Sequence, residues 1–442
     1  MRRYAVVPVF VFCLSYTAAA LAQTAPMATM APMAPGEAPT PALEATGPLS
    51  LQQALALAFA ANPGLAVAQR ELEAAEGPLL QGRARPNPEL SALMEDTRPA
   101  TRTTTIQLNQ LIELGGKRDA RIRAAEGGRD IALAELSARR ADVRGAVVTA
   151  FYDVLLAQER ITLAGDSVTL AQRASDAAGK RVQAGKISPV EATKAGVAEA
   201  TARLEAAQAA SELRLARQRL AATWGNGTPR FERAEAAGAA VTQLPSTPTP
   251  QALAARLATS PSLQRAQVEV RRRQALSELE RARRTPDLTA SLGVRRDAQS
   301  GRSQAIVGLA IPLPLFDRNQ GNLLEALRRE DKARDELVAA GIGLKTAVLQ
   351  SAGQLDAASN EARTIRDTVL PGAQSAYDAA TTGFELGKFN FLDVLDAQRT
   401  LFQAKAQYLR ALGAAQAAAA EIDRLLGDGG LPLTSPPAQF QE

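Results

Sequence analysis

Histidine is absent from the 442 residues, and cysteine occurs once, at Cys13. These absences exclude catalysis by a cysteine nucleophile or a serine–histidine pair, and they exclude a histidine-bound metal. Only Asp, Glu, Lys and Tyr remain as catalytic side chains, which supports an enzyme poorly. We therefore predict no enzymatic activity, no cofactor and no resident metal site.

A strong excess of one charge is also lacking. The pI is about 9.5, but the formal net charge is only +5 and both signs are mixed along the chain. This pattern is typical of a solvated surface and not of a basic stripe, so we predict no nucleic-acid partner. After the N-terminus there is no run of about 20 apolar residues, so we expect no transmembrane helix in the mature chain.

The N-terminal residues have the features of a secretory signal peptide. Arg2 and Arg3 precede an apolar segment, Ala5–Leu21, which ends in the small-x-small sequence Ala20-Leu21-Ala22. We predict that residues 1–22 are removed, and Cys13 with them. The mature chain would then hold no cysteine and would depend on packing alone.

Residues 23–47 form a segment rich in Pro and Ala that lacks any period. Such a composition indicates a low-complexity linker. Met27, Met30 and Met33 recur at every third position in it, and their thioethers are soft ligands that suit Cu(I). A plain tether and a metal-capturing tail both remain open for these methionines.

The rest of the chain contains one large unit twice, with an offset near 200 residues. The sequence around Pro63 returns around Pro261, that around Pro88 returns around Pro286, and Gly185-Lys186 returns as Gly387-Lys388. Duplication at this length indicates two copies of one unit and not a short-period solenoid. We predict repeats at 48–227 and 251–427, a Pro-rich linker at 228–250 and a tail at 428–442.

Each repeat begins with short helices and continues with a hairpin. A helix at Leu51–Ala61 ends before Pro63, and a second helix is expected to run to about Arg85. Two strand-like segments follow in each half, in which apolar residues such as Leu288 and Leu292 alternate with polar or small ones. Each hairpin should therefore have one apolar face and one polar or small face.

A helix of unusual length follows each hairpin. No proline occurs from Lys117 to about Ala184, and such a helix would span roughly 100 Å. Its larger apolar residues repeat with a period near 3.5, which is typical of coiled-coil packing. They are Val143, Val147, Phe151, Val154, Ile161 and Val168. A turn at Gly185–Pro189 separates it from a returning helix that ends at Trp224-Gly225, and the second half repeats this plan around Gly387–Phe391.

Two hairpins give only four strands, which cannot close a barrel. Open strand edges are not tolerated in lipid, so a membrane barrel needs strands from several copies. Three copies would supply twelve strands, within the known range for barrels. The predicted fold class is mainly α with a β membrane part. We expect such an assembly to have the barrel strands at one end and the long helices at the other.

The duplicated plan resembles the TolC family of outer-membrane efflux proteins over residues 48–427. Two motifs, Glu113–Arg118 after the first hairpin and Pro312–Gly321 after the second, are similar to the CzcC-like heavy-metal resistance branch. The resemblance implies a homotrimer in the outer membrane of a Gram-negative cell, with a twelve-stranded barrel above a periplasmic helical tunnel. It also implies two partners, a periplasmic adaptor and an inner-membrane resistance-nodulation-division pump, and export of heavy-metal cations.

The resemblance further implies two kinds of functional residue. Asp393 and Asp396, three apart and so on one helix face, would line the pore constriction, where three copies would attract cations. The first repeat has Glu191 and Lys194 at the equivalent positions and so lacks the acidic pair. The turns between the long helices would dock the adaptor. They comprise Gly185, Lys186, Ile187, Ser188, Gly387, Lys388, Phe389 and Asn390.

This sequence departs from the family pattern in one place, and the resemblance leaves alternative functions open. Multidrug members close the mouth with a Tyr and an Arg, where this chain has Phe384 and Phe389, so apolar closure would replace a polar latch. Within the family the rivals are a multidrug channel and a type I secretion channel. A rival of another class is the periplasmic coiled-coil adaptor, but it would have one helical hairpin and not a duplicated one.

Overall fold

The computed structural model describes residues 44–235, 244–386, 388–389 and 391–427. The chain divides into two units, Met1–Thr40 and Pro41–Glu442, and all described residues belong to the second. The predicted signal peptide, the Met27, Met30 and Met33 segment and the 428–442 tail lie outside the described residues.

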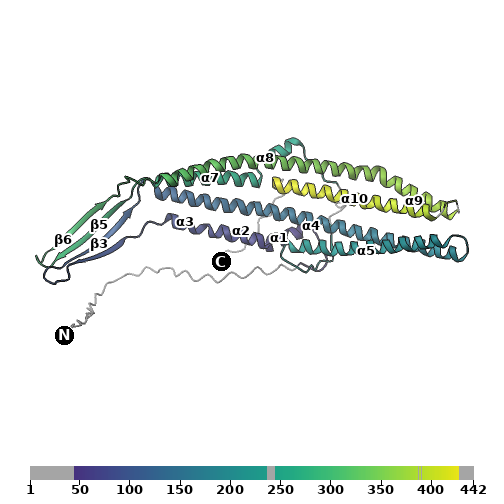
Figure 1. Cartoon of the computed structure of the whole chain (residues 1–442), viewed down its shortest axis with the longest axis horizontal. Coiled ribbons are helices and arrows are strands. Elements are labelled where there is room, and N and C mark those ends of the chain that lie inside the picture. Colours follow the sequence, from purple (N-terminus) through teal and green to yellow (C-terminus); the bar gives the residue numbers. More distant parts are fainter. Residues whose placement is uncertain (1–43, 236–243, 387, 390, 428–442) are drawn as a thin grey trace, which may run out of the picture. The chain divides into compact units, whose positions relative to one another are not determined.

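Both halves of the described chain follow the same order of helices and strands (Figure 1). The elements of the first half are β1 (Pro48–Leu49), α1 (Leu51–Ala61), α2 (Pro63–Ala74), α3 (Glu76–Arg83), β2 (Glu89–Glu95), β3 (Thr103–Ile112), α4 (Lys117–Gln183), α5 (Pro189–Ala222) and β4 (Arg233–Ala234). Those of the second half are α6 (Pro250–Leu257), α7 (Pro261–Ala282), β5 (Leu288–Asp297), β6 (Ser303–Ala310), α8 (Gln320–Thr364), the π-helical segment η2 (Ile365–Val369), α9 (Leu370–Glu385) and α10 (Phe391–Leu426).

The second helix of the first half is broken, contrary to the sequence prediction. Instead of one helix to Arg85, the structure has α2 and α3, which meet at Ala75. The reason is Pro78, which has no amide proton to donate to the Ala74 carbonyl and whose ring would crowd that carbonyl.

The two predicted hairpins are present, and they join into one antiparallel sheet with the strand order β2-β3-β5-β6. Strands β3 and β5 pair across the two halves, with Leu108 opposite Leu292, and Leu108 also lies opposite Leu90 of β2. Strands β2 and β6 are the two edges of this sheet within the described chain. Their main-chain groups on the outer sides remain available for pairing.

The two faces of the sheet differ as the alternation predicted. Leu90, Leu292 and Val307 share one face through their register, and each is more than half exposed. On the other face, the Asn109 side-chain amide donates to Ser91 Oγ at 3.2 Å, and Ser291 Oγ donates to Asn109 Oδ1 at 2.8 Å. A hydrogen-bonded polar row therefore crosses β2, β3 and β5, while the apolar face has no cover within the described chain.

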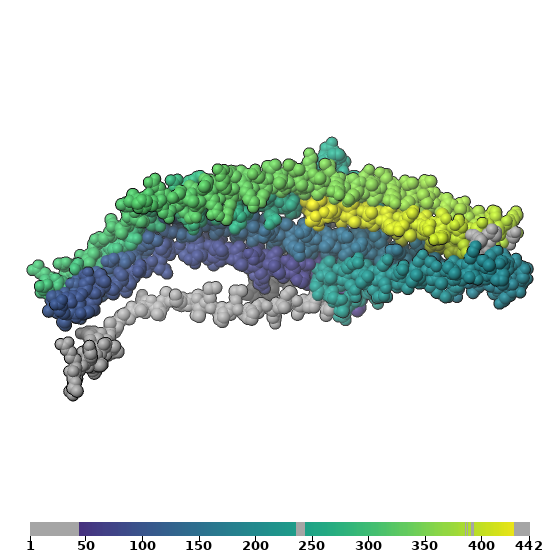
Figure 2. All heavy atoms as spheres, in the orientation of Figure 1, coloured from purple at the N-terminus to yellow at the C-terminus, as the bar shows by residue number. Residues whose placement is uncertain are grey.

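The long helices carry the core. Helix α4 packs against α5 of its own half and against α7 and α10 of the other half, and α8 packs against α7 and α10. Figures 1 and 2 show the second-half helices lying along α4, with the strands at one end of the helices and the α4–α5 and α9–α10 turns at the other. Val147, Phe151 and Val154 of the predicted coiled-coil series are fully buried.

One interruption of the long helices was missed by the sequence analysis, which expected breaks only at the turns. Ile365–Val369 forms a π-helix in which the Leu370 amide donates to the Ile365 carbonyl. Pro371 lies two residues after this segment and cannot donate an amide proton. The wider π-helical turn changes the direction of the preceding carbonyls, with which the proline ring would otherwise clash.

A test of length and hydropathy finds no single membrane-crossing helix among the described residues. The bent pair Leu51–Ala61 and Pro63–Arg83, which meet at 43°, passes the test together.

Candidate functional site at the helix turns

The first turn is a tight link between α4 and α5. Gly185 has a φ of +67°, and its amide donates to the Val182 carbonyl at 2.9 Å, while the Lys186 amide donates to the Arg181 carbonyl at 2.9 Å. These two bonds close the end of α4, and the left-handed backbone at this point favours glycine. Ser188 then begins α5, because its Oγ accepts from the Val190 amide at 3.3 Å.

The second turn, between α9 and α10, is closed by a different set of bonds. The Gly383 carbonyl accepts from the amides of Lys388 at 2.7 Å and Phe389 at 3.2 Å. The Phe389 ring lies over Gly383, where an added Cβ would come within 2.1 Å of a ring carbon. Gly387 and Asn390, two predicted docking residues, lie outside the described residues.

A small apolar cluster joins the two turns. Ala178 of α4 and Ala195 of α5 are buried, and Ile187, Phe384 and Leu395 pack around them. The turns of the two halves therefore lie together, which the sequence offset alone did not require.

The two phenylalanines at the expected latch positions have different surroundings. The Arg181 guanidinium lies 3.9 Å from the centre of the Phe384 ring, a cation–π contact between α4 and α9. Phe384 thus helps to hold the halves of one chain together, and Phe389 is the half-exposed one of the pair. Closure of a pore by these rings stays a prediction, and Phe389 is the better placed of the two.

The predicted acidic pair begins α10. Asp393 lies in the first turn of the helix, where the helix dipole favours a negative charge, and both Asp393 and Asp396 are exposed. Val394 and Gln398 are buried, so this part of α10 turns those residues inward and the two acids outward. Within the described chain, no three His, Cys, Asp or Glu side chains come together as a metal site. A joint action of several such acids would therefore require more than one copy.

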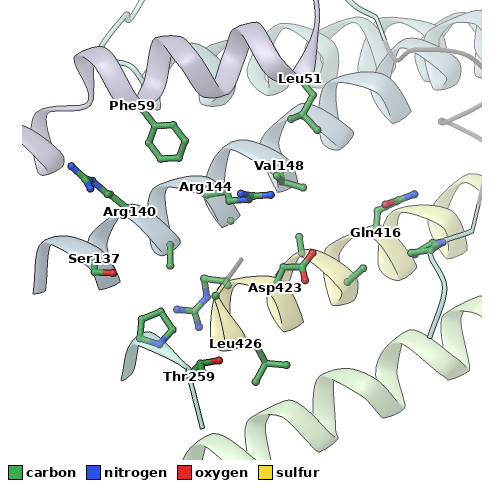
Figure 3. A pocket seen from close by; sticks show the side chains of 18 of the residues that line it. Leu51, Phe59, Ser137, Arg140, Arg144, Val148, Thr259, Gln416, Asp423 and Leu426 are labelled. Carbon is green, nitrogen blue, oxygen red and sulfur yellow. The ribbon is translucent and has the colours of Figure 1, made fainter. Parts of the chain in front are cut away.

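A cavity of about 540 Å³ lies between α1, α4, α10 and the start of α7, and the sequence analysis did not predict it. Figure 3 shows Phe59 and Leu51 of α1 on one side, Arg140 and Arg144 along α4, and Asp423 on α10. Arg424, which also lines the cavity, donates to Asp142 at 2.8 Å and to Glu421 at 2.7 Å. Hydrogen bonds to both acids raise the pKa of Arg424. Arg424, on the wall of this cavity, thus joins the two halves through its ion pair with Asp142.

Glu44 is a second feature that sequence reasoning missed. Its side chain is 3% exposed, and it accepts hydrogen bonds from Trp224 Nε1 at 3.0 Å, from Asn226 Nδ2 at 2.8 Å and from the Arg230 amide. Burial alone raises the pKa of Glu44, but these three donors outweigh it and hold the pKa below its ordinary value of 4.5. The only tryptophan in the chain was the available signal, since a buried indole N–H needs an acceptor.

Comparisons with known proteins agree with this geometry. A family model described as "Outer membrane efflux protein" matches residues 54–226 and 252–428. The cobalt-zinc-cadmium resistance protein CzcC of Cupriavidus metallidurans is 53% identical over 384 residues, covering 87% of this chain and 91% of that protein.

Two solved structures share the fold at lower identity. VceC of Vibrio cholerae has a TM-score of 0.71 at 20% identity and covers 86% of this chain and 96% of its own, and CusC has 0.72 at 19%, covering 86% and 92%. The family match covers well over half of the chain, and it sets aside the periplasmic adaptor as an alternative. The chain belongs to the outer membrane efflux protein family, in the CzcC-like branch that its motifs indicated.

Proposed function

We propose that three copies of this chain form an outer-membrane channel that exports heavy-metal cations. The observation that carries the proposal is the four-stranded sheet, which exposes one apolar face and, among the described residues, leaves the outer sides of β2 and β6 unpaired. An apolar face suits lipid, but open edges do not, and pairing β6 of one copy with β2 of the next removes them. Three copies give a barrel of twelve strands.

The polar row of Ser91, Asn109 and Ser291 supports the same arrangement. In a closed barrel with Leu292 and Val307 toward lipid, this row faces the lumen, where water satisfies its remaining polar groups. The long helices would continue the barrel into the periplasm as a tunnel.

The relatives support the proposed cargo, and membership of the family supports the proposed partners. CzcC is named for cobalt, zinc and cadmium resistance, and this chain is 53% identical to it. The acidic pair of this chain, near the helix turns, would attract divalent cations. We infer a periplasmic adaptor and an inner-membrane resistance-nodulation-division pump as partners. The adaptor would dock on the turns that contain Gly185–Ser188 and residues 387–390, and Asp393 and Asp396 would line the constriction.

Fractionation and a complementation assay test the proposal together. The mature chain should separate with outer membranes and migrate as a trimer in mild detergent. A strain that lacks the chain should lose growth at raised cobalt, zinc or cadmium, and the parent gene should restore it. A monomer in the periplasmic fraction would refute the assembly, whereas a trimer whose loss changes drug tolerance but not metal tolerance would favour a multidrug channel.

A further inference from the structure

A set of buried positions recurs in both repeats at constant offsets, so residues of one repeat can be equated with residues of the other. In the short helices, Leu79 and Ser277 are both buried, at the offset that also equates Pro63 with Pro261. In the long helices, buried positions of α4 match buried positions of α8, and the difference in residue number is the same for each pair. These pairs are Ala132 and Ala333, Val143 and Leu344, Val147 and Val348, Val154 and Leu355, and Ala157 and Ala358.

Beyond the π-helix the offset increases by one residue, so that Ala171 corresponds to Ala373 and Ala178 to Ala380. A π-turn adds one residue to a helix, which accounts for this change. The equivalence is therefore structural from Ala132 to Ala178 of α4.

Inside one chain, an ion pair crosses the boundary between the repeats. Arg123 of α4 lies 3.2 Å from Glu278 of α7, and both side chains are about half exposed, at 53% and 50%. By the two offsets, Arg123 corresponds to Leu324 of α8, and Glu278 corresponds to Leu80 of α3.

These two leucines have large exposed surfaces. Leu80 is 67% exposed and Leu324 is 57% exposed. Helix α4 has partners from both repeats, whereas the main partners of α8 are α7 and α10 of its own repeat. Among the described residues, the side of α8 that corresponds to the α7-facing side of α4 is thus open, as is the corresponding side of α3.

We propose that Leu80 of one copy meets Leu324 of the next, in the position that Glu278 and Arg123 occupy within each chain. This inference rests on the trimer proposed above and names one contact of its interface. The partner of this open side follows from the order of the repeats. If one copy follows another as the second repeat follows the first, α8 packs on α2 and α3 of the next copy in the way that α4 packs on α7. The boundary between chains is then apolar where the boundary between repeats is ionic.

Cysteine cross-linking tests the contact directly. Cys13, in the predicted signal peptide, is the only cysteine of the chain, so Leu80→Cys with Leu324→Cys creates the only thiols of the mature protein. A short bismaleimide should convert the double variant into covalent dimers and trimers on denaturing gels. The matched control, Arg123→Cys with Glu278→Cys, should remain monomeric on the same gels because it links within one chain, and the loss of its two free thiols shows that the reagent spans this geometry.

Charge exchange provides an independent measurement. Leu80→Glu or Leu324→Arg alone should lower the temperature at which the trimer dissociates in detergent by a few degrees. The double variant, which recreates the ion pair at the chain boundary, should recover that loss at low salt and lose part of the recovery at high salt.

The outcomes separate this inference from the proposed function. A parent protein that migrates as a monomer would remove the trimer and the contact together. A stable trimer that gives no Leu80–Leu324 cross-link, while the control links, would overturn the contact and leave the channel proposal in place. A double charge variant as unstable as the sum of the two single variants would likewise overturn it.

Discussion

At the scale of single residues, Glu44 is a buried carboxylate with a structural role. Glu44 fixes the start of the described chain to the segment after α5, because one carboxylate accepts from three donors on Trp224, Asn226 and Arg230. Such a carboxylate is costly to replace, since all three donors lose their acceptor in a buried place.

We expect Glu44→Gln to lower the free energy of unfolding by about 1–3 kcal/mol at pH 7, because the amide cannot accept from all three donors. Thermal unfolding of the detergent-solubilised protein, followed by circular dichroism, measures the loss. Glu232→Gln, which changes an exposed acid nearby, is the control and should be neutral. Equal effects of the two substitutions would contradict the anchoring role.

The same carboxylate predicts a pH dependence. Because the pKa of Glu44 is lowered in the folded protein, its contribution is complete above the ordinary value of 4.5 and is lost as pH falls through the lowered pKa. The stability difference between the parent and Glu44→Gln should therefore be constant above pH 4.5 and should shrink below it. A difference that grows on acidification would rule out this assignment.

The acidic pair makes a prediction about current. Replacing both Asp393 and Asp396 by Asn keeps the shape of the helix and removes six charges per trimer, so it separates electrostatics from packing. Planar-bilayer recordings should show lower cation selectivity and weaker block by multivalent cations. High salt should reduce the difference, because it screens the charges. Equal selectivity at low salt would mean that the two acids do not face the pore.

At the scale of helices and strands, the turn after α4 depends on one backbone conformation. Gly185 has a φ of +67°, and no atom lies within 4 Å of where its Cβ would be. A substitution there is strained by the backbone and not by crowding. Gly179, four residues before the end of α4, has equally open space around its Cβ and ordinary helical geometry.

Gly185→Val should therefore distort the turn, at a cost of about 1–2 kcal/mol, because a β-branched residue rarely adopts a positive φ. We expect loss of metal resistance and of cross-linking to the adaptor, with normal expression and an intact trimer. Gly179→Val is the matched control and should retain both activities. If the Gly185 variant still confers full resistance, the adaptor docks elsewhere.

At the scale of the whole molecule, the orientation of the sheet determines which face meets lipid. Val307 of β6 is 78% exposed on the apolar face, and Gln304 lies on the opposite face of the same strand. In the assembled barrel these two positions would meet lipid and water respectively.

Val307→Arg should destabilise the inserted protein by about 2–4 kcal/mol, since an arginine near the middle of the bilayer is costly, whereas Gln304→Arg should insert normally. The amount of trimer recovered from outer membranes measures both effects. Comparable losses from the two variants would contradict the proposed orientation of the sheet.

The sequence by itself determined the order of the hairpins and long helices and the position of the first turn. Strict alternation around Leu288 and Leu292, the absence of proline after Lys117 and the glycine at position 185 each act through neighbouring residues, so hairpins, long helices and the first turn could be predicted locally. The family motifs and the duplication indicated the channel class for the same reason, since both are patterns of the linear sequence.

Only the tertiary structure decided which elements pair and pack with one another. The pairing of β3 with β5, the cluster that joins Ile187 to Phe384, and the three donors on Glu44 all link residues far apart in sequence. The break at Ala75 and the π-helix before Pro371 arise from single prolines whose effect depends on whether packing keeps the helix continuous. Periodicity specifies which face of an element is apolar, but the partner that covers this face is selected by the free energy of packing the whole chain.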